Sequence, residues 1–124
     1  MQMPTWENIE IHPPPGENCT FGPETTWLVA SGYRFEFTVD GNLQILNPAR
    51  EKVWESGTAG SEARKFSLQP GGELSLHSGN GGEALWRASI GGSPGAFLAF
   101  QNDGNLVLYS AEREPLWATD TNGK

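Results

Sequence analysis

A hairpin-forming segment occurs three times in this chain, and this repetition limits the possible folds more than any other feature of the sequence. The three copies run from Phe37 to Asn47, from Leu68 to Ser78 and from Phe100 to Ser110. Each copy has a glycine at the same loop position, with spacings of 31 and then 32 residues, at Gly41, Gly72 and Gly104. A tryptophan follows further along each copy, at Trp54, Trp86 and Trp117. A repeat of this period predicts one supersecondary unit that is used three times.

The third copy predicts a hairpin with two chemically different faces. Asn102, Asp103 and Gly104 lie between apolar-rich runs, as expected for a type I turn closed by a glycine in the left-handed region. Side chains alternate along a strand, so the residues around this loop divide between the two faces. One face carries Gln101, Asn105, Val107 and Tyr109, with the Asp103 carboxylate at the tip, whereas Leu106 and Leu108 point the other way. The leucine face suits a core and the polar face suits a polar ligand.

The three copies predict a single all-β domain. Alternation at Tyr33, Phe35 and Phe37 indicates a half-buried strand before the first loop, and no segment has sustained helical periodicity. No unit could bury its apolar face alone, so we expect units of about 33–60, 64–92 and 96–124 to pack together. Their expected core residues are Trp54, Trp86 and Trp117. We expect the domain to span 16–124, preceded by a Pro-rich arm over 1–15.

Composition excludes several classes of function. The net charge is −7 and there is no cluster of Lys and Arg, which argues against nucleic acid and anionic membranes as partners. No apolar run is long enough to predict a membrane span or a signal peptide, and both cytoplasmic and secreted locations stay open. The single cysteine, Cys19, excludes an internal disulfide. No nucleophile stands beside a base, and neither His12 nor His77 has neighbours at metal-ligand spacing. We therefore expect no enzyme activity, no catalytic residue, no cofactor and no metal.

The polar face of the third hairpin carries a known sequence pattern. Gln101, Asp103, Asn105, Val107 and Tyr109 spell Q-x-D-x-N-x-V-x-Y, which resembles the sugar-binding signature of the bulb-type, snowdrop agglutinin-like mannose-binding lectins. The segments PGENCTFG (15–22) and LVASGYRFEF (28–37) resemble the first strands of that family, so the resemblance covers roughly residue 15 to the end. It implies a β-prism II fold, with three four-stranded sheets around a pseudo-threefold axis. It also implies non-catalytic binding of mannose and mannosyl glycans.

The resemblance assigns roles to these residues. It implies that Gln101, Asp103 and Asn105 bind hydroxyls around the axial 2-position, that Tyr109 reaches the 4-hydroxyl and that Val107 packs on the ring carbons. Amides, carboxylates and phenols together donate and accept as a hexose requires. The other two copies are degenerate. The first keeps Asp40 and Asn42, the second keeps only Gln69, and these three are the remaining candidate sugar-binding residues.

Two further hypotheses follow from the sequence. Trp6 and the Pro-rich arm could cover a second protomer, because members of the family often pair by exchanging terminal strands, which gives a homodimer as one hypothesis. The alternative function is a lectin-like protein-interaction or bacteriocin-type module, in which the loss of motif residues in two copies reflects loss of sugar binding. The complete motif in the third copy argues against that alternative.

Overall fold

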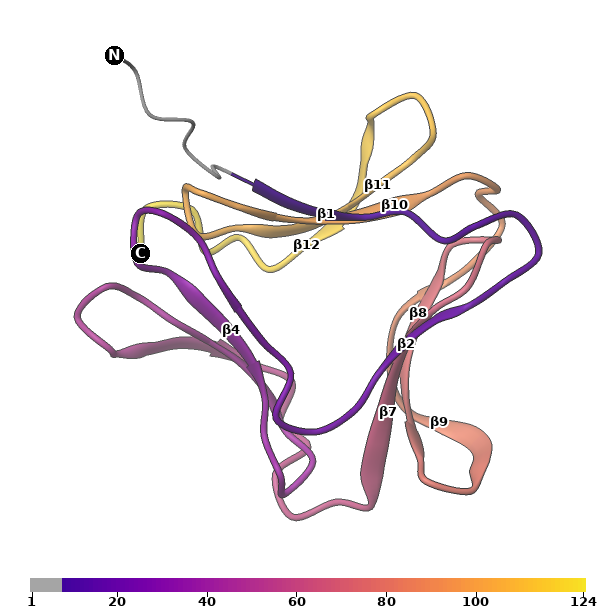
Figure 1. Cartoon of the computed structure of the whole chain (residues 1–124), viewed down its shortest axis with the longest axis horizontal. Coiled ribbons are helices and arrows are strands. Elements are labelled where there is room, and N and C mark those ends of the chain that lie inside the picture. The colour runs from indigo at the N-terminus through magenta and orange to yellow at the C-terminus, as the bar shows by residue number, and fades with distance from the viewer. Residues whose placement is uncertain (1–7) are drawn as a thin grey trace.

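The computed structural model describes residues 8–124, whose strands form three antiparallel four-stranded sheets arranged as the sides of a triangle (Figure 1). The first sheet has the order β3-β4-β5-β6, from strands Thr26–Leu28, Arg34–Phe37, Leu43–Leu46 and Lys52–Glu55. The second sheet has the order β2-β7-β8-β9, from Cys19–Phe21, Ala63–Leu68, Glu73–Ser78 and Gly81–Ile90. The third sheet has the order β1-β10-β11-β12, from Asn8–Ile11, Phe97–Gln101, Leu106–Tyr109 and Pro115–Ala118. This arrangement confirms the predicted all-β prism of three four-stranded sheets.

Each repeat supplies three strands of one sheet, and the N-terminal segment supplies the fourth strand of every sheet. β1, β2 and β3 are consecutive in the chain, yet each pairs with a different sheet. β1 pairs along its whole length with β10, from Asn8 opposite Gln101 to Ile11 opposite Leu98. Residues 8–11, which the sequence analysis assigned to an arm outside the domain, are therefore an edge strand of the third sheet. No local sequence pattern predicts that these residues form a strand of the third sheet, because the pairing joins residues about 90 positions apart.

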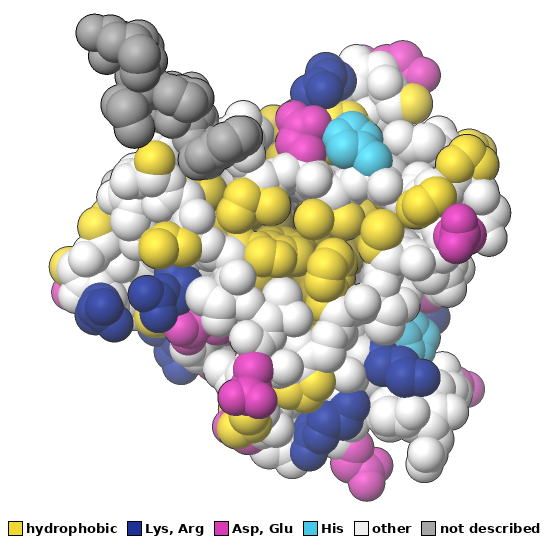
Figure 2. Space-filling model, viewed as in Figure 1, with side chains coloured by type: hydrophobic (Ala, Val, Ile, Leu, Met, Phe, Trp, Pro, Cys, Tyr) yellow, Lys and Arg dark blue, Asp and Glu magenta, His cyan; other side chains and the backbone are white. Residues whose placement is uncertain are grey.

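Apolar faces of all three sheets meet in one core. Phe35, Phe66 and Phe100 are fully buried there, with the Phe35 ring centroid 5.6 Å from that of Phe66 and 6.3 Å from that of Phe100. The predicted burial of Phe35 and Phe37 is confirmed at 0% exposure. Figure 2 shows hydrophobic side chains gathered at the centre of one face of the triangle, with charged side chains around its edge.

One tryptophan from each repeat contacts the tryptophans of the other two repeats. The ring centroids of Trp54, Trp86 and Trp117 are 5.8 to 6.0 Å apart in all three pairings, and the rings meet edge to face. Such a pair contributes about 0.5–1.5 kcal/mol beyond the burial of its surface. The three residues are partly buried and pack against the buried core.

Each hairpin loop packs on the beginning of the next unit in a cyclic order. A Cβ placed on Gly41 would lie 2.7 Å from Ser61, and one on Gly72 would lie 3.2 Å from Ala96. The third loop returns to the first unit, where a Cβ on Gly104 would lie 2.4 Å from the ring of Tyr33. The repeated glycines are therefore sites of close approach between units as well as turn residues. No helix in residues 8–124 is long and apolar enough to cross a bilayer.

Candidate functional site

The β10–β11 hairpin has the loop geometry that its sequence predicts. The Gly104 N–H donates to the Gln101 carbonyl at 2.9 Å, which closes the turn, and the Gln101 N–H donates to the Asn105 carbonyl at 2.9 Å. Gly104 has a φ of 92°, in the region that favours glycine. The Asp103 carboxylate accepts the Asn105 N–H at 2.9 Å, so this side chain also stabilises its own turn.

The hairpin tip is fixed by segments distant in sequence. Asn102 accepts hydrogen bonds from Ser31, from its N–H to Asn102 Oδ1 at 2.8 Å and from its hydroxyl to the Asn102 carbonyl at 2.5 Å. The Asn102 N–H donates to Asn8 Oδ1 at 3.0 Å, and the Gly123 N–H donates to the Asp103 carbonyl at 2.8 Å. The turn between β3 and β4, strand β1 and the C-terminal segment thus hold the tip in place.

The predicted division of the hairpin into two faces is present in the structure. Leu106 and Leu108 are buried in the core at 1% and 0% exposure. On the outer face, Gln101 Nε2 donates to the Tyr109 hydroxyl, so residues eight apart in sequence meet. Val107 shares this face but is only 2% exposed, so it presents little apolar surface to a ligand.

Asn105 holds the strand after the site with one half of its amide. Its Oδ1 accepts from the Thr119 hydroxyl at 3.1 Å and from the Thr121 N–H at 3.3 Å. Its Nδ2 has no hydrogen-bond acceptor within residues 8–124. Ala118, which pairs with Val107 on the neighbouring strand, has no polar group to offer that nitrogen. The Asn105 amide is therefore oriented by the protein and keeps two N–H donors for another partner.

The first copy uses the same amide differently. Asn42 Oδ1 accepts from Ser56 at 3.2 Å and from the Thr58 N–H at 3.1 Å, as Asn105 does in the third copy. Here, however, Asn42 Nδ2 donates to the Glu55 carboxylate at 3.0 Å, and Asn42 is 3% exposed. Glu55 pairs with Gln44 in the first sheet, as Ala118 pairs with Val107 in the third, so the two residues occupy equivalent positions. Glu55 thus accepts from the Asn42 amide in the first copy, whereas Ala118 at the equivalent position leaves the Asn105 amide nitrogen available in the third.

The other candidate residue of the first copy is also engaged. The Thr38 hydroxyl donates to the Asp40 carboxylate. Hydrogen bonds from Asn42 and then Lys52 hold the pKa of the Glu55 carboxyl below its usual range. The polar groups of this face therefore satisfy one another.

The second copy keeps Gln69 within a changed network. The Ser75 hydroxyl lies 3.2 Å from the Glu73 carboxylate and 2.8 Å from His77 Nε2. His77 Nδ1 lies 3.0 Å from the Gly82 carbonyl, and Arg87 lies 3.8 Å from Glu73. These residues replace the asparagine, valine and tyrosine of the third copy, so this face lacks the predicted sugar motif.

Residues that the motif did not include border the third face. The Phe97 ring stacks on Tyr109 at 5.5 Å between centroids, and His12 stacks on Phe97 at 4.4 Å. The Arg113 guanidinium lies 4.8 Å from the centre of the Phe97 ring and pairs with Glu10 at 3.3 Å. The sequence analysis missed these neighbours because two of them come from β1 and its end, and only the strand register brings them beside Tyr109.

The pKa values of Glu10, beside the third face, and of Cys19, on β2, depart from their usual values for local reasons. Hydrogen bonds from His12 and then Arg113 lower the pKa of the Glu10 carboxyl. Burial raises the pKa of the Cys19 thiol, which disfavours its reactive thiolate. No group of three or more His, Cys, Asp or Glu side chains in residues 8–124 could hold a metal ion.

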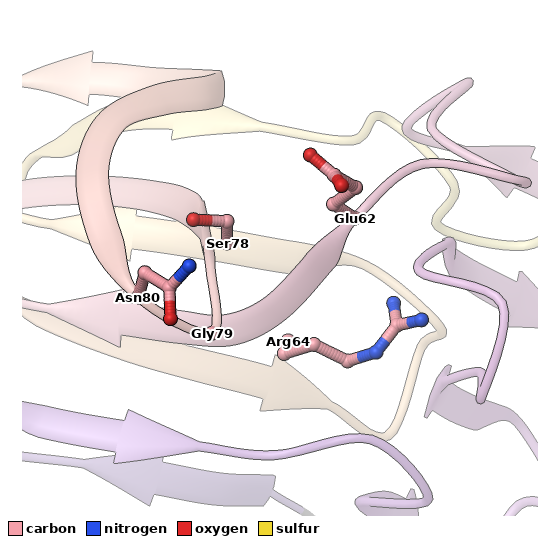
Figure 3. Close-up of a pocket in the computed structure, with 5 residues that line it drawn as sticks. All are labelled: Glu62, Arg64, Ser78, Gly79 and Asn80. Carbon is pink, nitrogen blue, oxygen red and sulfur yellow. The ribbon is translucent and has the colours of Figure 1, made fainter.

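Two cavities lie beside the second sheet. The larger, of about 510 Å³, covers its outer face and includes Gln69 and His77. The smaller, of about 250 Å³, lies at the β8–β9 turn and is lined by Glu62, Arg64, Ser78, Gly79 and Asn80. Figure 3 shows the Glu62 and Arg64 side chains on one side of this cavity and Ser78 and Asn80 on the other. None of the residues lining the smaller cavity belongs to the predicted sugar-binding set.

Comparison with solved structures finds several lectins with this architecture. The chain matches the solved structure of a lectin from Marasmius oreades with a TM-score of 0.77 and 27% identity over 91% of each chain. It matches a monomeric monocot mannose-binding lectin from Gastrodia elata with a TM-score of 0.72 and 28% identity, over 94% of this chain and 98% of that one. This chain has the fold of the bulb-type mannose-binding lectins. The mannose-specific agglutinin of snowdrop, Galanthus nivalis, solved with methyl α-D-mannoside, shares this fold with a TM-score of 0.64 and 24% identity, over 93% and 96% of the two chains.

The comparisons bear on two sequence predictions. The resemblance to bulb-type lectins is confirmed at the level of structure, and the matched structures described above are lectins, in agreement with the prediction that the chain is not an enzyme. A scan against family models and a search of curated protein sequences give no match.

Proposed function

We propose that this protein is a mannose-binding lectin and that the outer face of the β10–β11 hairpin binds the sugar. The observation that carries the proposal is the Asn105 amide, which is oriented through Oδ1 yet keeps Nδ2 open, whereas Glu55 occupies the equivalent group in the first copy. The lectin from Gastrodia elata, with 28% identity, is described as mannose-binding, which supports the same ligand class here.

The open groups on this face match a hexose. Asp103 has a second carboxylate oxygen beyond the one that caps the turn, and it accepts a sugar hydroxyl. Asn105 Nδ2 donates to a neighbouring hydroxyl. Gln101 and Tyr109, already bonded to each other, add an amide oxygen and a phenol. Because an epimer with a misplaced hydroxyl leaves one of these groups unpaired, discrimination of about 1–3 kcal/mol per group is expected.

Affinity at this face is low. Val107 offers little apolar surface to a ligand, so we expect a Kd near 1 mM, which corresponds to about −4 kcal/mol. Each chain carries one complete motif, so multivalent binding requires more than one chain. The homodimer predicted from Trp6 and the arm remains a hypothesis, and Trp6 lies outside the described residues. A monomer mass that does not change with concentration in sedimentation equilibrium contradicts it.

The test is an NMR titration of ¹⁵N-labelled protein with methyl α-mannoside, with methyl α-glucoside as the ligand control. We expect saturable shifts at Gln101, Asn105 and Tyr109 with the mannoside. Asp103→Asn keeps the side-chain oxygen that caps the turn and replaces the second oxygen with an amide NH2, which donates where the carboxylate accepts. It is therefore expected to weaken binding at least tenfold without unfolding the hairpin. Asp40→Asn is the matched control in the first copy. Equal shifts with both sugars, or no effect of Asp103→Asn, overturn the proposal.

A further inference from the structure

The second sheet has an outer face whose chemistry differs from that of the third sheet. Strand register relates the two faces position by position. Lys65 pairs with His77 as Phe97 pairs with Tyr109, and Ser67 pairs with Ser75 as Ala99 pairs with Val107. The apolar and aromatic positions of the third face are thus a cation, an imidazole and two hydroxyls in the second.

A cavity of about 510 Å³ lies on this polar face. Its lining contains two glycines, Gly81 and Gly82, and six polar side chains. These six come from β2, β7 and β8 and from the residues just before β2 and just after β7, namely Asn18, Thr20, Lys65, Ser67, Gln69 and His77. Amides and hydroxyls that both donate and accept therefore surround the cavity on several sides.

Lys65 supplies the charge of the cavity. Its ammonium makes no ion pair or hydrogen bond with residues 8–124, whereas the nearby Arg64 donates to backbone carbonyls and Arg87 pairs with Glu73. Glu73, the acid on this face, is already paired with Arg87 at 3.8 Å. In a chain with a net charge of −7, this leaves an unpaired cation among neutral polar groups.

The His77 imidazole, the cross-strand neighbour of Lys65, is held in position. His77 Nδ1 lies 3.0 Å from the Gly82 carbonyl, which can only accept, so Nδ1 carries the proton and donates. His77 Nε2 then accepts from the Ser75 hydroxyl at 2.8 Å, and Ser75 is fully buried. The imidazole is therefore oriented by two contacts from within the second sheet.

We propose that this cavity binds a sugar carrying a carboxylate, such as a hexuronic acid residue of an acidic polysaccharide. The Lys65 ammonium forms a charge-assisted hydrogen bond with the carboxylate, and the amides of Asn18 and Gln69 with the Thr20 hydroxyl take the sugar hydroxyls. A neutral hexose lacks a partner for Lys65, so the site prefers the acid. This site is separate from the proposed mannose site on the third sheet, so a negative result at one site does not contradict binding at the other.

The probe is methyl α-D-glucuronide, titrated into ¹⁵N-labelled protein, with its neutral methyl ester as the matched ligand. We expect saturable shifts at Lys65, Gln69 and His77 with the acid, and at least tenfold weaker binding of the ester. Lys65→Gln, an exposed substitution on β7, is expected to reduce binding of the acid at least tenfold, whereas Lys52→Gln on the first sheet leaves it unchanged. Residues 101–109 report the mannose site separately in the same spectra.

Three results overturn the proposal. The first is the absence of shifts around the second-sheet cavity at high glucuronide concentration. The second is equal binding of acid and ester, which means that the carboxylate is not recognised. The third is equal displacement of the glucuronide by acetate or inorganic phosphate at the same concentration, which means that the cavity binds anions without recognising a sugar.

Discussion

Gly104 is the residue whose substitution tests most directly how the third hairpin is held. Its φ of 92° disfavours any residue with a Cβ, and a Cβ there would lie 2.4 to 2.8 Å from three atoms of the Tyr33 ring. The left-handed conformation costs a non-glycine residue about 1–2 kcal/mol, and overpacking of a tight contact about 1–3 kcal/mol. Gly104→Ala is therefore expected to lower the free energy of unfolding by about 2–5 kcal/mol.

Gly60→Ala separates the two contributions. Gly60 has a φ of 82°, and nothing lies within 4 Å of a Cβ at that position, so only the backbone term of about 1–2 kcal/mol applies. Urea denaturation followed by tryptophan fluorescence measures both variants. The double variant Tyr33→Ala/Gly104→Ala should lose less free energy of unfolding than the sum of the losses of the two single variants, because Tyr33→Ala already removes the contact. Equal destabilisation by Gly104→Ala and Gly60→Ala refutes the close approach to Tyr33.

Two further predictions concern the sites. Ala118→Glu places a carboxylate where the first sheet has Glu55, so it is expected to capture Asn105 Nδ2 and abolish mannoside shifts in the NMR titration while leaving the fold intact. Persistence of binding in that variant contradicts the role assigned to the open amide. The lowered pKa of Glu10 means that its contact with His12 stabilises the fold above the ordinary carboxyl pKa and that this contribution is lost as pH falls through the lower, folded pKa. Glu10→Gln should remove that part of the acid dependence of unfolding, measured by urea denaturation between neutral and acidic pH.

The sequence was sufficient for the local structure of the repeats. The alternation of Leu106 and Leu108 with Asn105, Val107 and Tyr109, together with a glycine at each loop, specifies hairpins whose leucine sides must pack together. These features depend on neighbouring residues, which a single sequence displays directly.

Tertiary structure decided which faces are open to a ligand. β1 joins the third sheet because its backbone pairs with β10, and nothing within residues 8–11 specifies a partner about 90 positions away. The Asn42 amide donates to Glu55, thirteen positions later, whereas Ala118 stands at the equivalent position of the third sheet. The same amide is thus occupied or available according to the residue that strand register places on the neighbouring strand. Local sequence fixes the direction in which a side chain points, and long-range pairing fixes what it meets there.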